Sequence, residues 1–485
     1  MSNTIRNEKV SRSGLRSECL SPLEVLGQSV ANIAPSATPA LVIPLVFATA
    51  GNGTWLAYLF ATIAIALVAG NLNQFTKRSA SPGSLYAYVA KGLGSNVGVI
   101  AGWALILAYI LTASAVLCGF VNYANVLFAY GGISIPSILI AIVGAAGAWF
   151  FAYKDIKIST KIMLAFEVIS LLLIILLAGF VLIKNGFSLD LGQFSLKGVS
   201  ITSIGTGLVL AFFSFTGFES ASSLGDEAKK PLKSIPRAIT RSALFVGAFF
   251  VVLSYSEVLG FVGSSTALNS AAAPLSDIAS KYGIGFFGPL ISIGALISFW
   301  ACFLACTNSG ARILFTMSQH GIFSSFIGDT HATNKTPHIA ITITAVLAAA
   351  VPLILIGKGS GLFEIYGWVG TIATYGFILL YTLISIAAPV YLYREKELKI
   401  KHVILSVSAV VVLLIPIVGS VYSNAQAAPY SWFIYFFIGW LVIGGLWLLI
   451  RKYQTPDVSA GISDRIEIVH QHYREIRANG DGEGI

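Results

Sequence analysis

The chain has 485 residues, of which 56% are hydrophobic and 11% are charged. Roughly a quarter of the residues in an ordinary soluble domain are charged, so this composition excludes a soluble globular protein. The formal net charge of +9 is compatible with a nucleic-acid partner, but the positions of the basic residues indicate a different cause.

Apolar runs of roughly 20 residues follow one another along the chain, and short polar segments separate them. One helix needs this length to cross the hydrocarbon core of a membrane. We therefore predict an all-α polytopic membrane protein with about twelve transmembrane helices. They lie near residues 24–50, 54–75, 97–128, 133–153, 159–184, 203–224, 238–262, 286–318, 338–357, 364–393, 402–422 and 430–450.

The two ends of the chain are polar. Residues 1–23 lack a convincing cleavage site for a signal peptide, so we interpret them as a cytoplasmic tail. Ser21-Pro22-Leu23-Glu24 then opens the first helix with a serine cap, a proline at the first helical position and a glutamate three residues after the cap. Residues 451–485 are interpreted as a second cytoplasmic tail, to which we assign no chemistry.

The basic residues divide unevenly between the two sides of the membrane. With the N-terminus inside, 26 of the 30 Lys and Arg residues lie on the cytoplasmic side, and the others are Lys184, Lys197, Lys281 and Lys358. This is the bias of the positive-inside rule. It predicts a multi-pass protein of the cytoplasmic (inner) membrane with both termini in the cytoplasm, and it explains the basic charge without nucleic acid.

Two of the predicted helices are interrupted near their middle. The first contains Pro35 and Pro39, each of which lacks a backbone donor and disfavours helix at the residue before it. The sixth contains Ser214, Thr216 and Gly217, which are small or hydroxylated residues. A break at membrane depth is tolerated only where protein groups or a water-filled cavity satisfy the backbone.

The paired breaks indicate a binding site. Helices one and six hold corresponding places in two sets of five, as in transporters built from inverted repeats around a midplane site. Free amides around Ser36 and Ala37 suit a carboxylate, and free carbonyls around Phe213 and Ser214 suit an ammonium group. An α-amino acid carries both groups on adjacent atoms. Isolated kinks are common in membrane helices, so the pairing of the breaks carries this prediction.

Residues 212–239, FFSFTGFESASSLGDEAKKPLKSIPRAI, resemble the amino acid–polyamine–organocation (APC) transporter superfamily. The similarity includes an aromatic-x-Gly-Phe-Glu block that ends at Glu219, followed by Glu227, Lys229, Pro231 and Ile235-Pro236-Arg237-Ala238-Ile239. A second block, residues 82–103, is similar to the family's loop between helices two and three and the start of helix three.

The resemblance implies a LeuT-type fold of five plus five inverted helices, two additional helices, and transport by alternating access. It divides the chain into a core at 24–393, with repeats near 24–184 and 203–393, and two further helices at 402–450. It also implies that the substrate backbone lies between the breaks, and Phe213 takes the place of the family's aromatic gate. With Gly217 from the break in helix six, the predicted substrate-binding residues are Pro35, Ser36, Ala37, Phe213, Ser214, Thr216 and Gly217.

The coupling ion depends on polar residues inside the helices. Glu167 and Glu219 are the acidic residues furthest from the water interfaces, so each is a candidate proton carrier or a hydrogen-bonding link between helices. A sodium site of the LeuT type needs hydroxyls from helix eight, for which Ser298 and Thr307 are candidates. Many sodium-independent members carry a lysine where this chain has Ser170, which favours sodium. We favour proton coupling and keep sodium as the alternative.

Two further glutamates, Glu257 and Glu364, lie near the outer ends of their predicted helices, and we expect both to be hydrated. No nucleophile–base pair, phosphate loop or metal cluster stands out, so we expect neither an enzyme nor a cofactor or metal site.

The sequence thus predicts a secondary active permease for an amino acid. A polyamine or other small-amine permease is the alternative within transport, and it requires several acidic residues around the site, where only Glu219 is a candidate. A membrane sensor that binds an amino acid without net transport is the alternative from another class. The expected partners are a small amine-bearing solute, H+ in preference to Na+, and the lipid bilayer, and the sequence assigns no oligomeric state.

Overall fold

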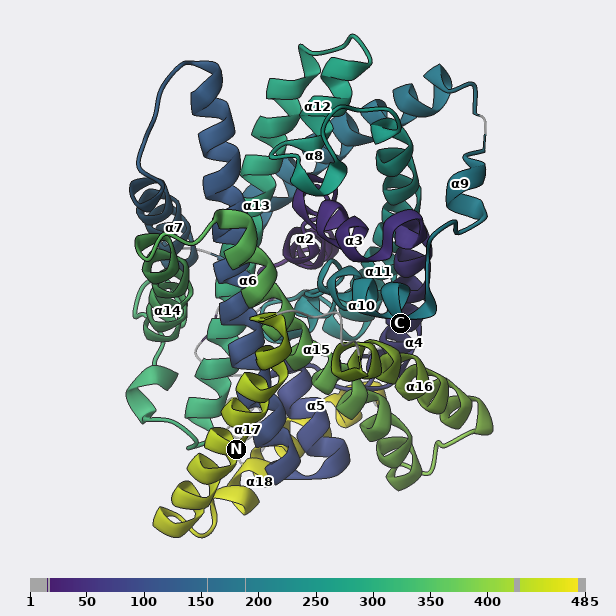
Figure 1. The fold of residues 1–485 in the computed structure, drawn as a ribbon. Coiled ribbons are helices and arrows are strands. Elements are labelled where there is room, and N and C mark those ends of the chain that lie inside the picture. Colours follow the sequence, from purple (N-terminus) through teal and green to yellow (C-terminus); the bar gives the residue numbers. More distant parts are fainter. Residues whose placement is uncertain (1–14, 16–17, 155, 188, 423–427, 479–485) are drawn as a thin grey trace.

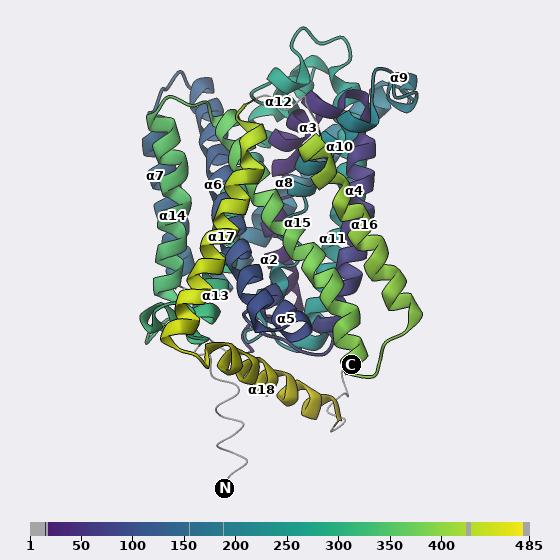
Figure 2. The ribbon, with the colours of Figure 1, turned by 60° about the horizontal axis from the view of Figure 1, so that its bottom comes forward.

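The computed structural model describes residues 15, 18–154, 156–187, 189–422 and 428–478 (Figure 1). Most of the predicted N-terminal tail (residues 1–14 and 16–17) and the last seven residues of the C-terminal one (479–485) therefore lie outside the described residues. Within them the long helices run side by side as one bundle, and shorter helices close its two ends (Figure 2). The one strand-like contact found in the described part of the chain is an isolated bridge between Leu20 and Ala228. The predicted all-α architecture is confirmed.

The chain enters the bundle through α2 (Pro22–Ile33), which begins with the predicted cap. The backbone N–H of Ser21 donates to Glu24 Oε2 at 2.7 Å, and the backbone N–H of Glu24 donates to Ser21 Oγ at 3.4 Å. The helices that follow in the first half are η1 (Thr38–Val42, a π-helical turn), α3 (Ile43–Ala50), η2 (Gly51–Gly53), α4 (Thr54–Thr76), α5 (Ser84–Leu93), α6 (Ser95–Tyr130), α7 (Ser137–Lys154), α8 (Ile156–Lys184) and α9 (Leu191–Phe194).

The second half begins with the divided sixth helix. Its elements are α10 (Ile201–Phe213), η3 (Ser220–Leu224), α11 (Pro231–Phe261), η4 (Leu268–Ser270), α12 (Pro274–Lys281), α13 (Phe287–Gln319), η5 (Ser325–Gly328), α14 (His338–Gly357), α15 (Leu362–Arg394), α16 (Ile400–Tyr422), α17 (Tyr430–Gln454) and α18 (Val458–Ala478).

Ten stretches of the described chain are long and apolar enough to cross a membrane. The first of them, Pro22–Thr76, doubles back at η2, so it holds two of the predicted crossings (Figure 2). The sixth predicted crossing is divided between α10 and η3 and is too short to be counted as one helix. The structure therefore agrees with about twelve crossings.

Helix α6 lies at the centre of the bundle and packs against α13 and α15. Small residues allow these close contacts, as is usual in membrane helices. A Cβ added at Gly119 would lie 2.4 Å from the Phe299 ring, and one added at Gly376 would lie 2.9 Å from Ala108 Cβ. Of the interrupted helices, α2 contacts α8 and α13, whereas α10 contacts α3, α4 and α15.

The two ends of the bundle are closed by different short helices (Figure 2). We call the end covered by α9 and α12 the α12 end, and the end covered by α5 and α18 the α18 end. The segment after the last predicted crossing is not a plain tail, because residues 458–478 form α18, which lies across this end. Arg474 of α18 pairs with Glu395 at 2.8 Å, and the Ser95 hydroxyl donates to the Ser459 carbonyl at 2.8 Å.

Candidate functional site

The first helix is interrupted where the sequence predicts it. Helix α2 ends at Ile33, and Ala34 adopts a left-handed conformation with φ 49°, which is uncommon outside glycine. The chain then turns through Pro35 and resumes as η1 at Thr38. Two prolines within five residues prevent a continuous ladder of hydrogen bonds here.

A carboxylate of the protein itself occupies the start of the second half of this helix. The backbone N–H and the hydroxyl of Ser36 donate to Glu167 Oε1 at 2.9 and 2.6 Å. The hydroxyl of Ser298 on α13 donates to Glu167 Oε2 at 2.6 Å. The Ser36 amide, which we expected to face a substrate carboxylate, therefore binds Glu167. Glu167 faces the bundle interior and joins α8 to helices one and eight.

The other candidate hydroxyl for a sodium site is bound within its own helix. Thr307 Oγ1 donates to the Phe303 carbonyl at 2.8 Å. Ser170, which stands where many family members have lysine, donates to the Gly294 carbonyl of α13 at 2.9 Å. In the described residues no cluster of three or more His, Cys, Asp or Glu side chains is placed to hold a metal ion.

The sixth helix is interrupted between Phe213 and Ser220, where residues 214–219 form turns. Gly217 has φ +97°, and a Cβ built on it would lie 2.5 Å from Asn32 Nδ2. This position therefore needs glycine both for its backbone conformation and for the close approach of helix one. The Ser29 hydroxyl of α2 donates to the Phe218 carbonyl at 2.8 Å, which ties the two broken helices together.

Glu219 holds the break in helix six against two neighbouring helices. The hydroxyls of Tyr109 on α6 and Tyr381 on α15 donate to its carboxyl oxygens at 2.7 and 2.8 Å. The Gly217 backbone N–H donates to the same carboxyl at 3.2 Å. Glu219 is fully buried. Its three donors make it the anchor of the irregular segment.

Both breaks open onto one small cavity of about 260 Å³, which thirteen residues line. Of the predicted binding residues, Ala37, Phe213, Ser214 and Thr216 line it. Pro35, Ser36 and Gly217 do not, since Pro35 shapes the turn, Ser36 binds Glu167 and Gly217 packs on Asn32. The structure thus brings four of the seven predicted residues to the cavity wall.

The cavity wall combines hydroxyls and aromatic rings. The Phe213 ring meets the Tyr366 ring edge-on, with centroids 5.8 Å apart. The hydroxyls of Ser214 and Tyr58 form a hydrogen bond at 3.0 Å, and the Thr216 hydroxyl donates to the Phe213 carbonyl at 2.8 Å. The predicted aromatic gate residue therefore borders the cavity and has a second aromatic partner.

Asn32 is one of the cavity residues that the sequence analysis did not predict. It immediately precedes the break, it is 2% exposed, and its Nδ2 has no hydrogen-bond partner among the described residues. Its Oδ1 accepts a hydrogen bond from the Cys306 thiol at 3.0 Å, and its carbonyl accepts one from Cys302 at 3.2 Å. The sequence feature that could have indicated Asn32 is an amide side chain inside an apolar run, next to the interruption. A buried amide group without an acceptor is costly, so this N–H group is suited to a bound solute.

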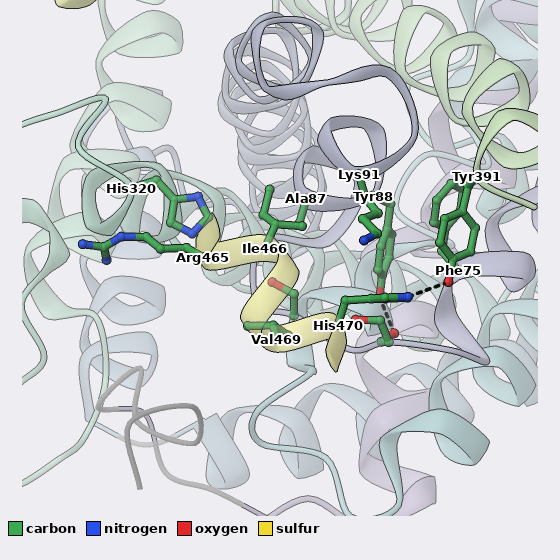
Figure 3. A pocket seen from close by; sticks show the side chains of 12 residues that line it. Phe75, Ala87, Tyr88, Lys91, His320, Tyr391, Arg465, Ile466, Val469 and His470 are labelled. Carbon is green, nitrogen blue, oxygen red and sulfur yellow. Dashed lines mark hydrogen bonds between the residues drawn. The ribbon is translucent and has the colours of Figure 1, made fainter. Parts of the chain in front are cut away.

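A second cavity of about 410 Å³ lies under α18 (Figure 3). His470 and Arg465 of α18 face Tyr391, Lys91 and His320 across it. His470 Nε2 and the Tyr391 hydroxyl are hydrogen-bonded at 3.0 Å, and Lys91 is paired with Glu467 of α18. Burial, helped by the positive charge of Lys91, lowers the pKa of His470 to about 4, so the imidazole is neutral at pH 7. The cavity therefore lies in the contact between α18 and the helical bundle.

The fold defines a multi-pass membrane protein whose two interrupted helices both line one small central cavity. The family model described as amino acid permease matches residues 26–464, and the chain belongs to this family.

Three relatives illustrate the range of the family. The branched-chain amino acid permease BcaP of Bacillus subtilis (strain 168) is 25% identical over 373 residues, covering 72% of this chain and 76% of the relative. The methylthioribose transporter of the same organism is 26% identical over 430 residues, covering 83% and 87%. The low-affinity putrescine importer PlaP of Escherichia coli (strain K12) is 28% identical over 303 residues, covering 60% and 65%. The expected membership of the APC superfamily is confirmed.

Proposed function

We propose that the protein is a secondary active permease for a neutral amino acid, which it carries by alternating access through the central cavity. The observation that carries this proposal is the unpartnered Asn32 amide group between the two helix breaks. It offers a donor for a substrate carboxylate. The Ser36 amide, which the sequence analysis assigned to that role, is bonded to Glu167 instead.

The lining of the cavity favours an amino acid over a polyamine. None of its thirteen residues is acidic or basic, and much of the wall is apolar or aromatic, including Ile33, Val42, Val116 and Phe213. A polyamine carries two or more positive charges, and desolvating them without carboxylates in the wall is costly. A zwitterion with an apolar side chain fits such a wall. The branched-chain amino acid permease among the relatives transports, by its name, a solute of this kind.

The first test is substrate binding and uptake by the purified protein in proteoliposomes. We expect uptake of at least one neutral amino acid, and we expect Asn32→Ala to weaken its binding about tenfold, the effect of losing one hydrogen bond to a charged group. Asn71→Ala is the matched control, because Asn71 is equally buried on α4 but does not line the cavity. Uptake of putrescine alone would support the amine-permease alternative, and binding without uptake would support the sensor alternative.

We further propose that protons drive the transport and that Glu167 links them to the helix movement. Its carboxylate accepts three hydrogen bonds from helices one and eight, the pair of helices that a sodium ion of the LeuT type would bridge. A proton on this carboxyl removes one acceptor position and so loosens the link between Ser36 and Ser298. Glu219 is the second candidate carrier, although its three donors fit an anchoring role as well.

The coupling is tested with imposed ion gradients. We expect accumulation under an inward proton gradient without sodium, and we expect Glu167→Gln to abolish accumulation while exchange of labelled substrate continues. Accumulation that only a sodium gradient drives would contradict the proposal, and Ser298 and Thr307 would then be the first residues to substitute.

The remaining proposals concern topology. We propose that the repeats near 24–184 and 203–393 are related by inversion, since α2 and α10 are interrupted at matching places. We also propose that the α18 end faces the cytoplasm of a cell whose inner membrane holds the protein, as the distribution of Lys and Arg predicts. A cysteine placed at the exposed Lys230 would then be unreactive to an impermeant reagent in intact cells. Labelling of this cysteine in intact cells would indicate the opposite orientation.

A further inference from the structure

Glu257 is a buried carboxyl group that has no hydrogen-bond donor among the described residues. It lies on α11, one turn before the end of that helix at the α12 end, and it is 3% exposed. The expectation that Glu257 is hydrated is therefore wrong. No N–H or O–H group of the described residues donates to either of its carboxyl oxygens. Glu364, the other glutamate expected to be hydrated, is exposed and caps α15 through the Gly361 backbone N–H.

The carboxyl group faces a separate cavity of about 250 Å³ with largely apolar walls. Leu177 and Val181 of α8 form one wall, and Leu275 and Ile278 of α12 form another. Pro39 of the first broken helix closes it. The next residue toward the break, Thr38, lines the central cavity instead. The same turn of helix one thus separates Glu257 from the proposed substrate.

The ionisable groups that surround Glu257 are occupied elsewhere. The Tyr58 hydroxyl of α4 is bonded to Ser214, and the Tyr123 hydroxyl of α6 donates to the Ala40 carbonyl at 2.9 Å. On α12, Lys281 donates to the Gly260 carbonyl at 2.9 Å, and Asp277 is acidic like Glu257 itself. None of these groups is hydrogen-bonded to the Glu257 carboxyl in the described structure.

Ionising a carboxyl in such a place is costly, because it is 3% exposed and no described group donates a hydrogen bond to it. Helix η1 and α12 form part of the wall, so moving them apart would let water reach Glu257. We propose that Glu257 is a proton-binding residue that keeps the α12 end closed when it is protonated and that ionises when this end opens. This inference rests on the proposed transport function and orientation, but not on Glu167 or on the coupling ion.

The proton in this scheme comes from the water outside and returns to it. Closing the α12 end transfers one proton from external water to a Glu257 carboxylate oxygen, and reopening releases it on the same side. The residue therefore sets how fast the transporter closes at a given external pH, without changing the number of protons that cross the membrane. External alkalinity should slow closing, because fewer Glu257 groups are protonated.

The test measures initial uptake rates at varied external pH and constant internal pH. We expect the wild-type rate to fall about tenfold per pH unit above its midpoint, as for a single titrating group. Glu257→Gln holds the group neutral, so its profile should lose this titration and keep only the pH dependence that the proposed proton coupling itself produces. Glu364→Gln is the matched control and should follow the wild type. A Glu257→Gln variant that keeps the wild-type pH profile, or a wild-type rate that does not depend on external pH, would overturn the proposal.

A second measurement tests the proton site independently of the proposed transport function. If no solute is transported by any variant, the proposed function fails, and the proton site is then judged by thermal unfolding of the purified protein. The unfolding midpoint of the wild type should fall with rising pH by about 2 to 4 °C relative to Glu257→Leu, because only the wild type must bury a charge. Parallel midpoints over the whole pH range would refute the proton site.

Discussion

Glu219 and Glu257 are both buried glutamates, and their surroundings differ in one respect. Three N–H and O–H groups from α6, α15 and the break itself donate to Glu219, whereas no described group donates to Glu257. Removing the first carboxyl leaves three donors without a partner, and removing the second leaves none. Burial alone therefore does not distinguish a structural carboxyl group from one that is free to bind a proton. The number of hydrogen-bond donors around the carboxyl group makes this distinction.

The largest expected difference in stability is between two variants that each lack one of these carboxyl groups. Glu219→Leu leaves the hydroxyls of Tyr109 and Tyr381 and the Gly217 N–H unsatisfied, at about 1 to 3 kcal/mol for each buried group. Glu257→Leu replaces a carboxyl in an apolar cavity and should be neutral or stabilising. Thermal unfolding in detergent compares them. Equal loss of stability in the two variants would remove the distinction between these sites.

A smaller effect is expected when a methyl group is added at Gly217. Gly217→Ala must keep φ near +97° and places Cβ against Asn32 Nδ2, so helix one has to move. We expect about 1 to 3 kcal/mol of destabilisation and loss of most substrate binding. Gly263→Ala separates the two causes, since Gly263 also has positive φ but has open space around it. Equal substrate binding in the two variants would show that the contact with Asn32 is unimportant.

Much of this architecture could be predicted from the sequence because it follows from local chemistry. The apolar runs, the cap at Ser21 and the interruptions near Pro35 and Gly217 all depend on neighbours in the chain. The partners of Glu167 and the burial of Glu257 depend on helices far away in sequence. Ser36 and Glu167 are 131 residues apart, and no periodicity shows that they meet. Glu257 lies only four residues before the end of α11, yet α12 and helix one cover it.

Removing one of the three donors to Glu219 should give an intermediate loss of stability. Tyr381→Phe deletes one hydroxyl and leaves the carboxyl with Tyr109 and Gly217. We expect about 1 to 2 kcal/mol of destabilisation, less than for Glu219→Leu, because the phenyl ring still fills the same space. Thermal unfolding again gives the measurement, with Tyr375→Phe on the same helix as a control, since the Tyr375 ring packs against Phe437 of α17. A loss as large as that of Glu219→Leu would mean that the carboxyl tolerates no change in its donors.

The smallest effect concerns a buried base at the α18 end. Burial lowers the pKa of His470 from its ordinary value of 6.5 to about 4, so the undocked helix binds a proton more readily than the docked one. The docking of α18 is therefore fully present above pH 6.5 and weakens as the pH falls from 6.5 through 4. Hydrogen exchange of residues 458–478 should accelerate over this window in the wild type. His470→Gln should remove most of the dependence, while His472→Gln, whose side chain does not line the pocket under α18, should retain it. An unchanged pH profile in His470→Gln would show that α18 is released by another group, with the Arg474–Glu395 pair as the nearest candidate.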